Sequence, residues 1–275
     1  MLGIDFSFSR IERDDFRRFY DAGYRVAIQD LWTGGYLNNQ GLKNVAALNL
    51  ADAQAEGFII AGYSNASPWY STEVSLKETI ANAGAMWDNL DVVAVDVEIA
   101  ALPTERIWHL AQALEAAGKR VCIYTGWWYY NGEGRPDWSD LYRYPQWLAD
   151  YATPPGTLLQ PIPGLGPVVG HQHAGSVDPF GVGIAVDLNE LDANWWEGDM
   201  SAITVSVTIP AGETVGVAEI IPVSGEFYFA TVQNLEIGPF VPKVGVTGPP
   251  LRRVIVEIPE AHSTELVYQV AILQV

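Results

Sequence analysis

The chain has 275 residues, of which 49% are hydrophobic and 17% are charged, so it has the composition of a folded protein and not of a disordered one. Its 33 acidic and 15 basic residues give a formal net charge of −18, which argues against binding of nucleic acid or anionic membranes through bulk charge. The one cysteine, Cys122, excludes an intramolecular disulfide and a cysteine-based metal cluster, and its apolar neighbours predict a buried position.

In the first half of the chain, predicted strands alternate with predicted helices. The strands are expected at 2–7, 24–29, 58–63, 92–99 and 121–125, and the helices at 11–22, 42–56, 73–90 and 103–118. This alternation is typical of parallel βα units in one barrel or sheet. Three further strands, at 146–149, 168–172 and 184–188, have no convincing helices between them, apart from a possible turn at 137–142. The count therefore predicts an irregular eight-stranded barrel.

The character of the sequence changes after Trp196, the last of ten tryptophans that begin at Trp32. Apolar and polar residues then alternate with a period of two at 203–209, and similar runs follow at 215–221, 226–232, 254–258 and 266–275. We predict two domains, an α/β barrel over residues 1–197 and a small all-β, sandwich-like domain over residues 198–275.

Carboxyl groups occur at three of the predicted strand ends. They are Asp5, the pair Asp96 and Glu98, and Asp187, which is followed by Asn189. Residues two apart on a strand face the same side, and the C-terminal ends of barrel strands form the usual active-site face. Any one of these acids has the alternative of a solvent-facing strand end, but four together repel one another and raise each other's pKa. A pair of carboxyl groups with separated pKa values is what cleavage of a glycosidic bond requires.

Several segments resemble the family 25 glycoside hydrolases. The sequences Gly3-Ile4-Asp5-Phe6-Ser7, Val95-Asp96-Val97-Glu98 and Val186-Asp187-Leu188-Asn189 are similar to the acidic segments of that family. Four other segments agree in order and spacing: Ala61-Gly62-Tyr63, Ile123-Tyr124-Thr125, Gln146 to Tyr151, and Gly170 to His173. The resemblance covers residues 2–196 and implies a (β/α)5(β)3 barrel of the TIM type. It also implies a phage-type lysozyme that cuts the β-1,4 bond between N-acetylmuramic acid and N-acetylglucosamine in peptidoglycan.

The resemblance implies a role for each matching residue. Glu98 is expected to be the general acid, and Asp96 to tune it or to orient the N-acetyl group of the substrate. Asp187 and Asp5 are expected to complete the cluster and to stabilise positive charge. The other expected binding residues are Tyr63, which is to bond within the cluster, and Tyr124, Gln172 and Asn189. For aromatic platforms in a glycan groove we expect Trp147 and one of Trp32 and Trp127, whereas Trp195 and Trp196 are expected to pack at the domain junction.

The sequence also departs from the family pattern. Gln29 to Gly34 replaces the usual Lys-Ala-Thr-Glu-Gly, Ser64-Asn65 replaces His-Phe, and His171 and His173 replace aromatic residues. These changes alter the expected groove walls and leave two alternatives open. One is a non-catalytic glycan-binding or virion structural module, and the other is a hydrolase of another N-acetylated glycan such as chitin.

No cofactor is expected, and no metal, because His171 and His173 share one face of a strand without a third ligand nearby. Bacterial peptidoglycan is the expected partner, without nucleic acid or membrane. The β domain is expected to serve oligomerisation, attachment to a particle or wall binding. The charged first twenty residues do not resemble a signal peptide, so we expect a host-cytoplasmic endolysin released after holin action, or a virion-associated enzyme.

Overall fold

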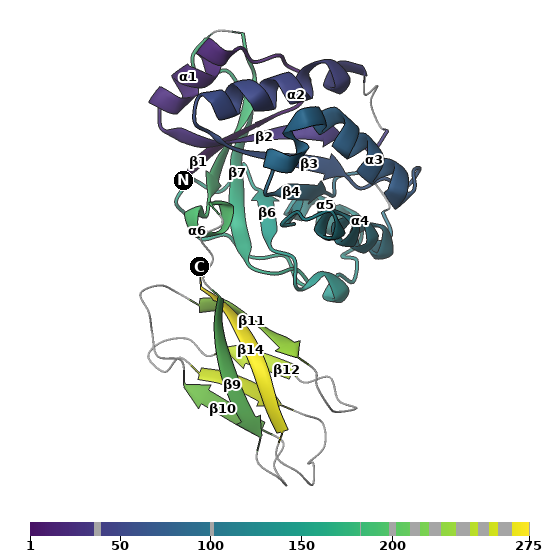
Figure 1. Ribbon diagram of the computed structural model, residues 1–275, viewed down its shortest axis with the longest axis vertical. Coiled ribbons are helices and arrows are strands. Elements are labelled where there is room, and N and C mark those ends of the chain that lie inside the picture. The colour runs from purple at the N-terminus through teal and green to yellow at the C-terminus, as the bar shows by residue number, and fades with distance from the viewer. Residues whose placement is uncertain are drawn as a thin grey trace. The chain divides into compact units, whose positions relative to one another are not determined.

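The computed structural model describes residues 1–35, 40–99, 102–181 and 183–197, together with six strands between residues 202 and 274 (Figure 1). The chain forms two compact units, Met1–Glu197 and Gly198–Val275. None of the described helices is both long and apolar enough to cross a membrane.

The first unit is a closed barrel in which eight strands follow one another in chain order. The strands are β1 (Leu2–Phe6), β2 (Tyr24–Trp32), β3 (Ile59–Asn65), β4 (Val93–Asp96), β5 (Ile123–Gly126), β6 (Gln146–Ala149), β7 (Val168–Val177) and β8 (Val186–Leu191). Neighbouring strands are parallel from β1 to β7, whereas β8 is antiparallel to both β7 and β1. The predicted irregular eight-stranded barrel is therefore confirmed.

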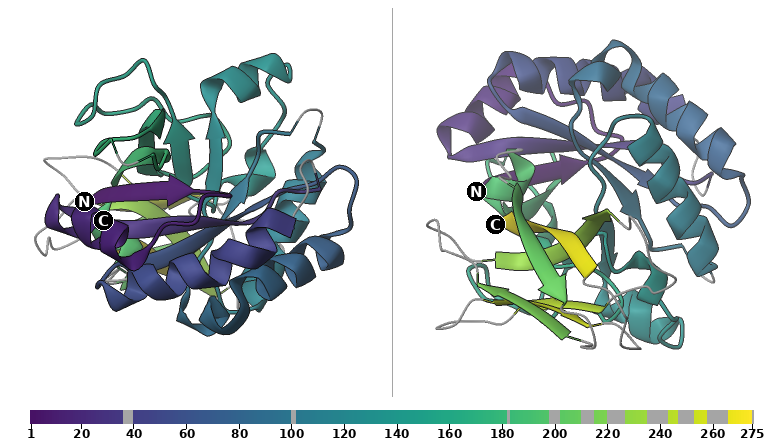
Figure 2. Two further views of the ribbon diagram at one scale, coloured as in Figure 1. Left: turned by 90° about the horizontal axis from the view of Figure 1, so that it is seen from above. Right: turned by 60° about the horizontal axis from the view of Figure 1, so that its bottom comes forward.

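Four long helices cover one side of the barrel, and Figure 2 shows them in purple to blue. They are α1 (Arg13–Asp21), α2 (Gln40–Ala55), α3 (Thr72–Ala83) and α4 (Thr104–Ala116). The predicted helix over 73–90 divides at Gly84, whose φ of +56° ends α3, and a 3₁₀ helix, η1 (Gly84–Asn89), follows. The remaining helical segments are short: α5 (Trp127–Gly132), η2 (Ser139–Leu141) and α6 (Ala193–Trp196). Aromatic α5 lies where no helix was predicted, because six residues are too few to show helical periodicity.

Two strand ends differ from the prediction in ways that affect the site. Strand β2 continues to Trp32 instead of ending at Gln29, and so includes Asp30. Strand β4 ends at Asp96, so Glu98 follows the strand and does not lie within it. The backbone N–H of Val97 still bonds to the carbonyl group of Tyr124 at 2.9 Å, which holds this segment against β5.

Alternation along β2 decides which side chains enter the barrel. The Gln29 side chain accepts a hydrogen bond at 2.8 Å from Asn49 on α2, so it faces the outer helices. Its neighbours Ile28 and Asp30 therefore face the interior. Ser64 of β3 likewise faces outward, because its hydroxyl group bonds to Thr79 of α3 at 2.7 Å.

Two glycines make room for bulky side chains inside the barrel. A Cβ atom on Gly3 would lie 2.5 Å from Leu191 Cδ1, and one on Gly170 would lie 2.7 Å from Trp147 Cδ1. Cys122, which directly precedes β5, is fully buried, as predicted, and burial raises the pKa of its thiol. The polar residues of the mouth therefore stand on a packed apolar base.

The described strands of the second unit form two three-stranded antiparallel sheets, with the strand orders β10-β13-β12 and β11-β14-β9. The strands are β9 (Ala202–Ile209), β10 (Val215–Glu219), β11 (Phe227–Asn234), β12 (Lys243–Val246), β13 (Arg253–Glu257) and β14 (Leu266–Gln274). Strand β9 contacts β10 and β13 of the other sheet, as in a sandwich. Strand β12 was not predicted, because four residues are too few for a clear alternation.

We expect Asn49→Leu to destabilise the barrel by about 3 kcal/mol, because buried polar groups lose their partners. The Asn49 side chain donates to the Ser9 carbonyl group and to Gln29, and it accepts from the Ile11 backbone and from Arg10. The measurement is urea unfolding followed by tryptophan fluorescence, which reports on the first unit because all ten tryptophans lie there. The neighbouring Leu48→Ala, which changes a side chain 55% exposed, is the control, and equal losses for the two variants would contradict the prediction.

Candidate active site

A layer of polar and aromatic side chains lines the mouth of the barrel, and every strand or strand end contributes to it. Its members are Asp5 (β1), Asp30 (β2), Tyr63 and Asn65 (β3), Asp96 and the following Glu98 (β4), Tyr124 (β5), Trp147 (β6), Gln172 (β7), and Asp187 and Asn189 (β8). Closure of the barrel thus brings together all four acids that the sequence indicated. Asp5, Asp30 and Asp96 are each 4% exposed, whereas Glu98 and Asp187 are half-buried and more open to solvent.

Asp187 joins this layer because β8 runs antiparallel to β1. It lies near the start of β8 and pairs with Asp5 at the C-terminal end of β1. A bulge in β7 between Ala174 and Val177 turns the backbone N–H of Ser176 onto Asp187 Oδ1 at 2.5 Å. Ser176 adopts a φ of +54°, which a non-glycine residue rarely takes. This bond favours the ionised form of Asp187.

Gln172 occupies the centre of the hydrogen-bond network. Its Nε2 atom donates to Asp5 Oδ2 at 2.9 Å and to Asp187 Oδ2 at 3.3 Å. Its Oε1 atom accepts from the hydroxyl groups of Tyr124 at 2.8 Å and of Tyr151 at 2.6 Å. An amide has two N–H donors and two lone pairs on its oxygen, so these four bonds use its full capacity. Gln172 is also 1% exposed, so it holds other residues in this structure, and its expected role as a substrate contact stays a prediction.

A second chain of hydrogen bonds supports Asp5 from below. The Trp147 indole N–H donates to Asn189 Oδ1 at 2.8 Å, and Asn189 Nδ2 donates to Asp5 Oδ2 at 2.7 Å. Asn189 is completely buried and supports the cluster, and its expected role as a substrate contact stays a prediction. The Trp147 ring packs against Tyr124 and Tyr63, with ring centroids 4.5 and 6.4 Å apart.

The pKa of Glu98 is raised to about 7. The largest cause is burial, and the charge of Asp187 adds to the rise, while a hydrogen bond to Tyr124 opposes it. Tyr124 is 7% exposed, and its single hydroxyl proton bonds either to Glu98 or to Gln172 Oε1, so it connects Glu98 to the amide at the centre of the network. A carboxyl group with this pKa keeps its proton near neutral pH and can donate it to a substrate.

Burial also raises the pKa values of the other predicted acids. Asp5 rises to about 7, because burial and the charge of Asp187 outweigh the bonds from Asn189 and Gln172. The pKa of Asp96 lies well above its usual value, through burial and then through Glu98 and Asp30, and its Oδ1 atom has no hydrogen-bond partner among the described residues. Burial also raises the pKa of Asp187, which the Ser176 N–H opposes.

Asp30 is a fifth acid of the cluster that sequence reasoning did not assign to the site. Burial raises its pKa to about 8, the Trp32 backbone N–H opposes the rise, and the charge of Asp5 adds to it. Its Oδ1 atom is buried without a partner in the described part of the chain. Asp30 pairs in register with Tyr63, whose pKa is raised by burial and then by the Asp30 charge. The sequence did contain a signal for Asp30, because an acid two residues after Ile28 faces the same side of the strand. The segment Gln29 to Gly34 had been interpreted only as a departure from the family pattern.

Two of the expected sugar platforms are buried. Trp147 is 1% exposed and fills the barrel interior, and Trp32 is 4% exposed and packs edge-on against Tyr70. Stacking on a sugar requires a free ring face, so the expectation for these two side chains is corrected. Trp127 is half-buried, and its indole N–H donates to the Gln160 carbonyl group at 2.9 Å.

Trp195 and Trp196 are both buried within the first unit. The Trp196 indole N–H donates to the Val169 carbonyl group at 2.8 Å, and the Arg120 guanidinium group lies 5.2 Å from the centre of the Trp195 ring. Their expected role at the domain junction stays a prediction.

Tyr151 is an exposed aromatic residue of the mouth that sequence reasoning did not assign. It follows β6, its side chain is 59% exposed, and its hydroxyl group reaches Gln172. The only signal was its position at the end of the segment Gln146 to Tyr151, which matched the family pattern.

The two histidines of β7 face away from the carboxyl cluster, because they alternate with Gln172. His171 Nε2 lies 2.8 Å from the Asp150 carbonyl oxygen, and burial lowers the pKa of His173. Among the described residues, no group of three or more His, Cys, Asp or Glu side chains is arranged to hold a metal ion.

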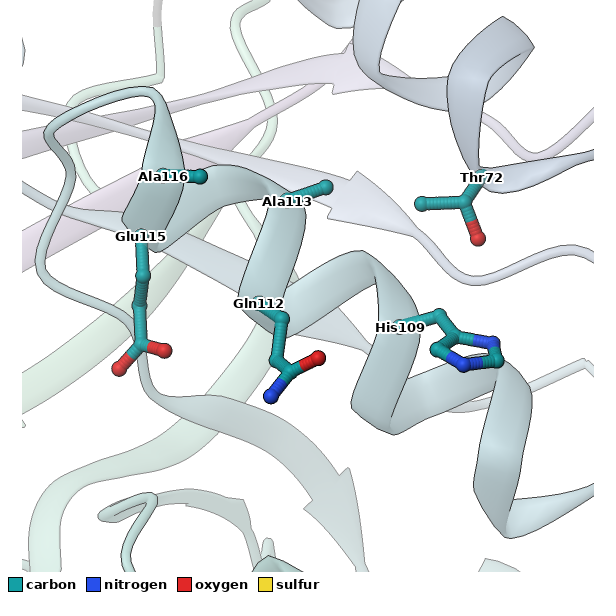
Figure 3. A pocket seen from close by; sticks show the side chains of 6 residues that line it. All are labelled: Thr72, His109, Gln112, Ala113, Glu115 and Ala116. Atoms are coloured by element: carbon teal, nitrogen blue, oxygen red, sulfur yellow. The ribbon is translucent and has the colours of Figure 1, made fainter.

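A shallow depression on the outside of the barrel contains none of these residues (Figure 3). It lies between the first turn of α3 and the outer face of α4, and is lined by Thr72, His109, Gln112, Ala113, Glu115 and Ala116. Figure 3 shows His109, Gln112 and Glu115 along the same helix, pointing outward and not toward one another. The carboxyl cluster at the mouth is therefore the candidate active site.

Comparisons with known proteins give a consistent result. Residues 4–181 match the family described as Glycosyl hydrolases family 25. The solved structure of a muramidase from Acremonium alcalophilum is similar at a TM-score of 0.56 and 22% identity, over 72% of this chain and 97% of that one. A bacterial lysozyme from Streptomyces coelicolor is similar at 0.53 and 20%, over 70% and 92%.

A third similar structure extends over both units of this chain. The spore cortex lytic enzyme SleM of Clostridium perfringens matches at a TM-score of 0.54 and 14% identity, over 100% of this chain and 98% of that one. At these identities the likeness of the three structures is one of fold. No curated protein sequence matches the chain.

We expect Asp30→Asn to stabilise the protein at pH 8 but not at pH 4. The folded pKa of about 8 exceeds an unfolded value near 3.9, so the native state binds the extra proton. The free energy of unfolding of the wild type must therefore fall as the pH rises from about 4 to 8. The variant lacks this contribution and should gain at least about 1.4 kcal/mol at pH 8, which corresponds to one pKa unit.

Urea unfolding at pH 4, 6 and 8 measures this difference. Asp140→Asn, at an exposed position in η2, controls for the change in net charge. A gain for Asp30→Asn that is the same at all three pH values, or that equals the gain for Asp140→Asn, would show that Asp30 is not a buried acid with a raised pKa.

We expect Gln172→Met to raise the pKa values of Asp5 and Asp187 by about one unit or more. A hydrogen bond to a charged group contributes about 1.5–3 kcal/mol, and methionine fills the space without donating one. Carboxyl ¹³C signals of aspartate-labelled protein, assigned with Asp5→Asn and Asp187→Asn, report the pKa values. Gln112→Met on α4 is the control, and unchanged pKa values in Gln172→Met would refute a positioning role.

Proposed function

Because the chain belongs to the family 25 glycosyl hydrolases, and is therefore a glycoside hydrolase, we propose that it is a lysozyme that cleaves the glycan strands of bacterial peptidoglycan. The bond proposed is the β-1,4 bond from N-acetylmuramic acid to N-acetylglucosamine. The observation that carries the proposal is that Glu98 and Asp187 are neighbouring, accessible carboxyl groups with different preferences for a proton. Glu98 has a pKa of about 7, and Asp187 stands beside it with a backbone donor that favours its ionised form.

In the proposed mechanism Glu98 donates its proton to the glycosidic oxygen as the bond to the anomeric carbon breaks. The carboxylate of Asp187 stabilises the positive charge that develops on the sugar ring. Its charge also raises the pKa of Glu98, so the ionised group keeps the proton donor protonated. The two accessible carboxyl groups thereby take different roles.

The buried acids take supporting roles in this proposal. Asp5 shares the Gln172 amide with Asp187 and helps to fix the position of that carboxylate. Burial raises the pKa of Asp96, which favours its protonated form, and its Oδ1 atom has no hydrogen-bond partner among the described residues. A protonated carboxyl group can donate a hydrogen bond, and the N-acetyl group of the bound sugar offers a carbonyl acceptor.

The products identify the bond that is cut. Hydrolysis after N-acetylmuramic acid leaves that sugar at the new reducing end, and borohydride reduction then converts it to muramitol. Cleavage after N-acetylglucosamine would give glucosaminitol instead. We expect muramitol from purified peptidoglycan, and release only from chitin would replace the proposed substrate by a different N-acetylated glycan.

We expect Glu98→Gln to lower the rate of reducing-end release from peptidoglycan by about 10²–10⁴, because the proton donor is lost while the shape is kept. The wild-type activity should fall as the pH rises above about 7, where Glu98 loses its proton. Glu105→Gln on α4, where the side chain is 77% exposed, is the control. Full activity of Glu98→Gln would refute the assignment of the acid, although not the substrate.

A further inference from the structure

Tyr151 combines an exposed ring with a buried polar contact. The side chain is 59% exposed, yet its hydroxyl group donates a 2.6 Å hydrogen bond to Gln172 Oε1, an atom inside the barrel mouth. Tyr124 donates to the same oxygen at 2.8 Å. The hydroxyl end of Tyr151 is therefore fixed, while much of its ring surface remains open to solvent.

The fixed end of Tyr151 lies near Asp187, one of the two accessible carboxyl groups. A Cβ atom on Gly175 would be 3.1 Å from the Tyr151 hydroxyl oxygen and 3.6 Å from Asp187 Oδ1, so both atoms flank the same glycine. The pKa of Tyr151 is raised to about 12, first by burial of the hydroxyl group and then by the charges of Asp187 and Glu98. A sugar held against these two acids would meet the Tyr151 ring.

Five tryptophans of the described barrel residues do not combine these properties. Trp147 and Trp32 are buried, and Trp127 is half-buried. Trp69 and Trp128 are 60% and 57% exposed, but in the described part of the chain neither donates a hydrogen bond to a member of the carboxyl cluster. Tyr151 is thus an exposed ring whose position is coupled to the acids by the Gln172 amide.

We propose that Tyr151 is the substrate-binding platform of the site, with its ring stacked on the apolar face of the sugar that lies against Glu98 and Asp187. The inference rests on the proposed function, because it requires a glycan in the mouth. Pyranose rings carry C–H groups on their faces, which pack on aromatic rings. The bond to Gln172 orders the ring before binding, so less conformational entropy is lost when the sugar arrives.

The ring and the hydroxyl group of Tyr151 have different roles in this proposal. The ring should determine affinity, whereas the hydroxyl group should affect the acids through Gln172. In Tyr151→Phe the ring remains, but Gln172 Oε1 loses one of its two donors. That variant should bind glycan nearly as well as the wild type and should show a shifted pH dependence of the rate.

The test measures binding without cleavage. Each variant is combined with Glu98→Gln, and the dissociation constant for a peptidoglycan tetrasaccharide is determined by titration calorimetry. Tyr151→Ala should weaken binding about tenfold, which corresponds to about 1.4 kcal/mol, and Tyr151→Phe should weaken it less than threefold. Tyr142→Ala, in which an equally exposed tyrosine (59%) is removed, should leave binding unchanged.

The outcomes distinguish this inference from the function on which it rests. If the single-site Glu98→Gln protein binds the tetrasaccharide and Tyr151→Ala weakens binding no more than Tyr142→Ala, the platform is refuted while the proposed function stands. If Tyr151→Phe loses as much affinity as Tyr151→Ala, the hydroxyl group and not the ring is responsible, and stacking is refuted. If the protein with its native residues neither binds nor cleaves peptidoglycan, the proposed function fails and the platform fails with it.

Discussion

Closure of the β-barrel forces alternate side chains of eight strands onto one axis, and at the mouth this brings five carboxyl groups together. In the described part of the chain, no lysine or arginine is among the groups that most affect their pKa values. The buried Lys119 instead donates to the carbonyl groups of Trp87 and Leu90. Burial without a compensating cation penalises the charged forms, so protons must occupy several of these acids near neutral pH. The rest of the site is arranged around that constraint.

Neutral hydrogen-bond donors, and not cations, offset the cost of burying the carboxylates. The amides of Gln172 and Asn189 bond to Asp5, and the Ser176 backbone N–H bonds to Asp187. Such donors stabilise a carboxylate without adding charge, so the remaining acids keep their raised pKa values. The result is a site in two levels, with Asp5, Asp30 and Asp96 buried and Glu98 and Asp187 accessible. A substrate can reach only the upper level, where one group gives up a proton and the other carries charge.

The side of the barrel with few helices supplies much of this machinery. Strands β6 to β8 are joined without long helices, and the chain there is free to form the β7 bulge and the segment that carries Tyr151. The antiparallel direction of β8 then places Asp187 at the same end of the barrel as Asp5. In a regular barrel of parallel strands, a residue near the start of the last strand would lie at the opposite end. The irregular part of the fold is therefore what completes the site.

The order of the barrel strands and four of the five acids could be predicted from the sequence alone. Alternation, turn residues and short acidic segments are local patterns. They can be recognised in the sequence without knowing which residues lie nearby in the fold. The folded structure was needed to show that Trp147 and Trp32 are buried and that Tyr151 is exposed. It also decided that Gln172 has no free hydrogen-bonding capacity and that Asp30 points into the mouth. These properties depend on which side chains pack against each residue across the barrel, and strand closure sets those partners at long range along the chain.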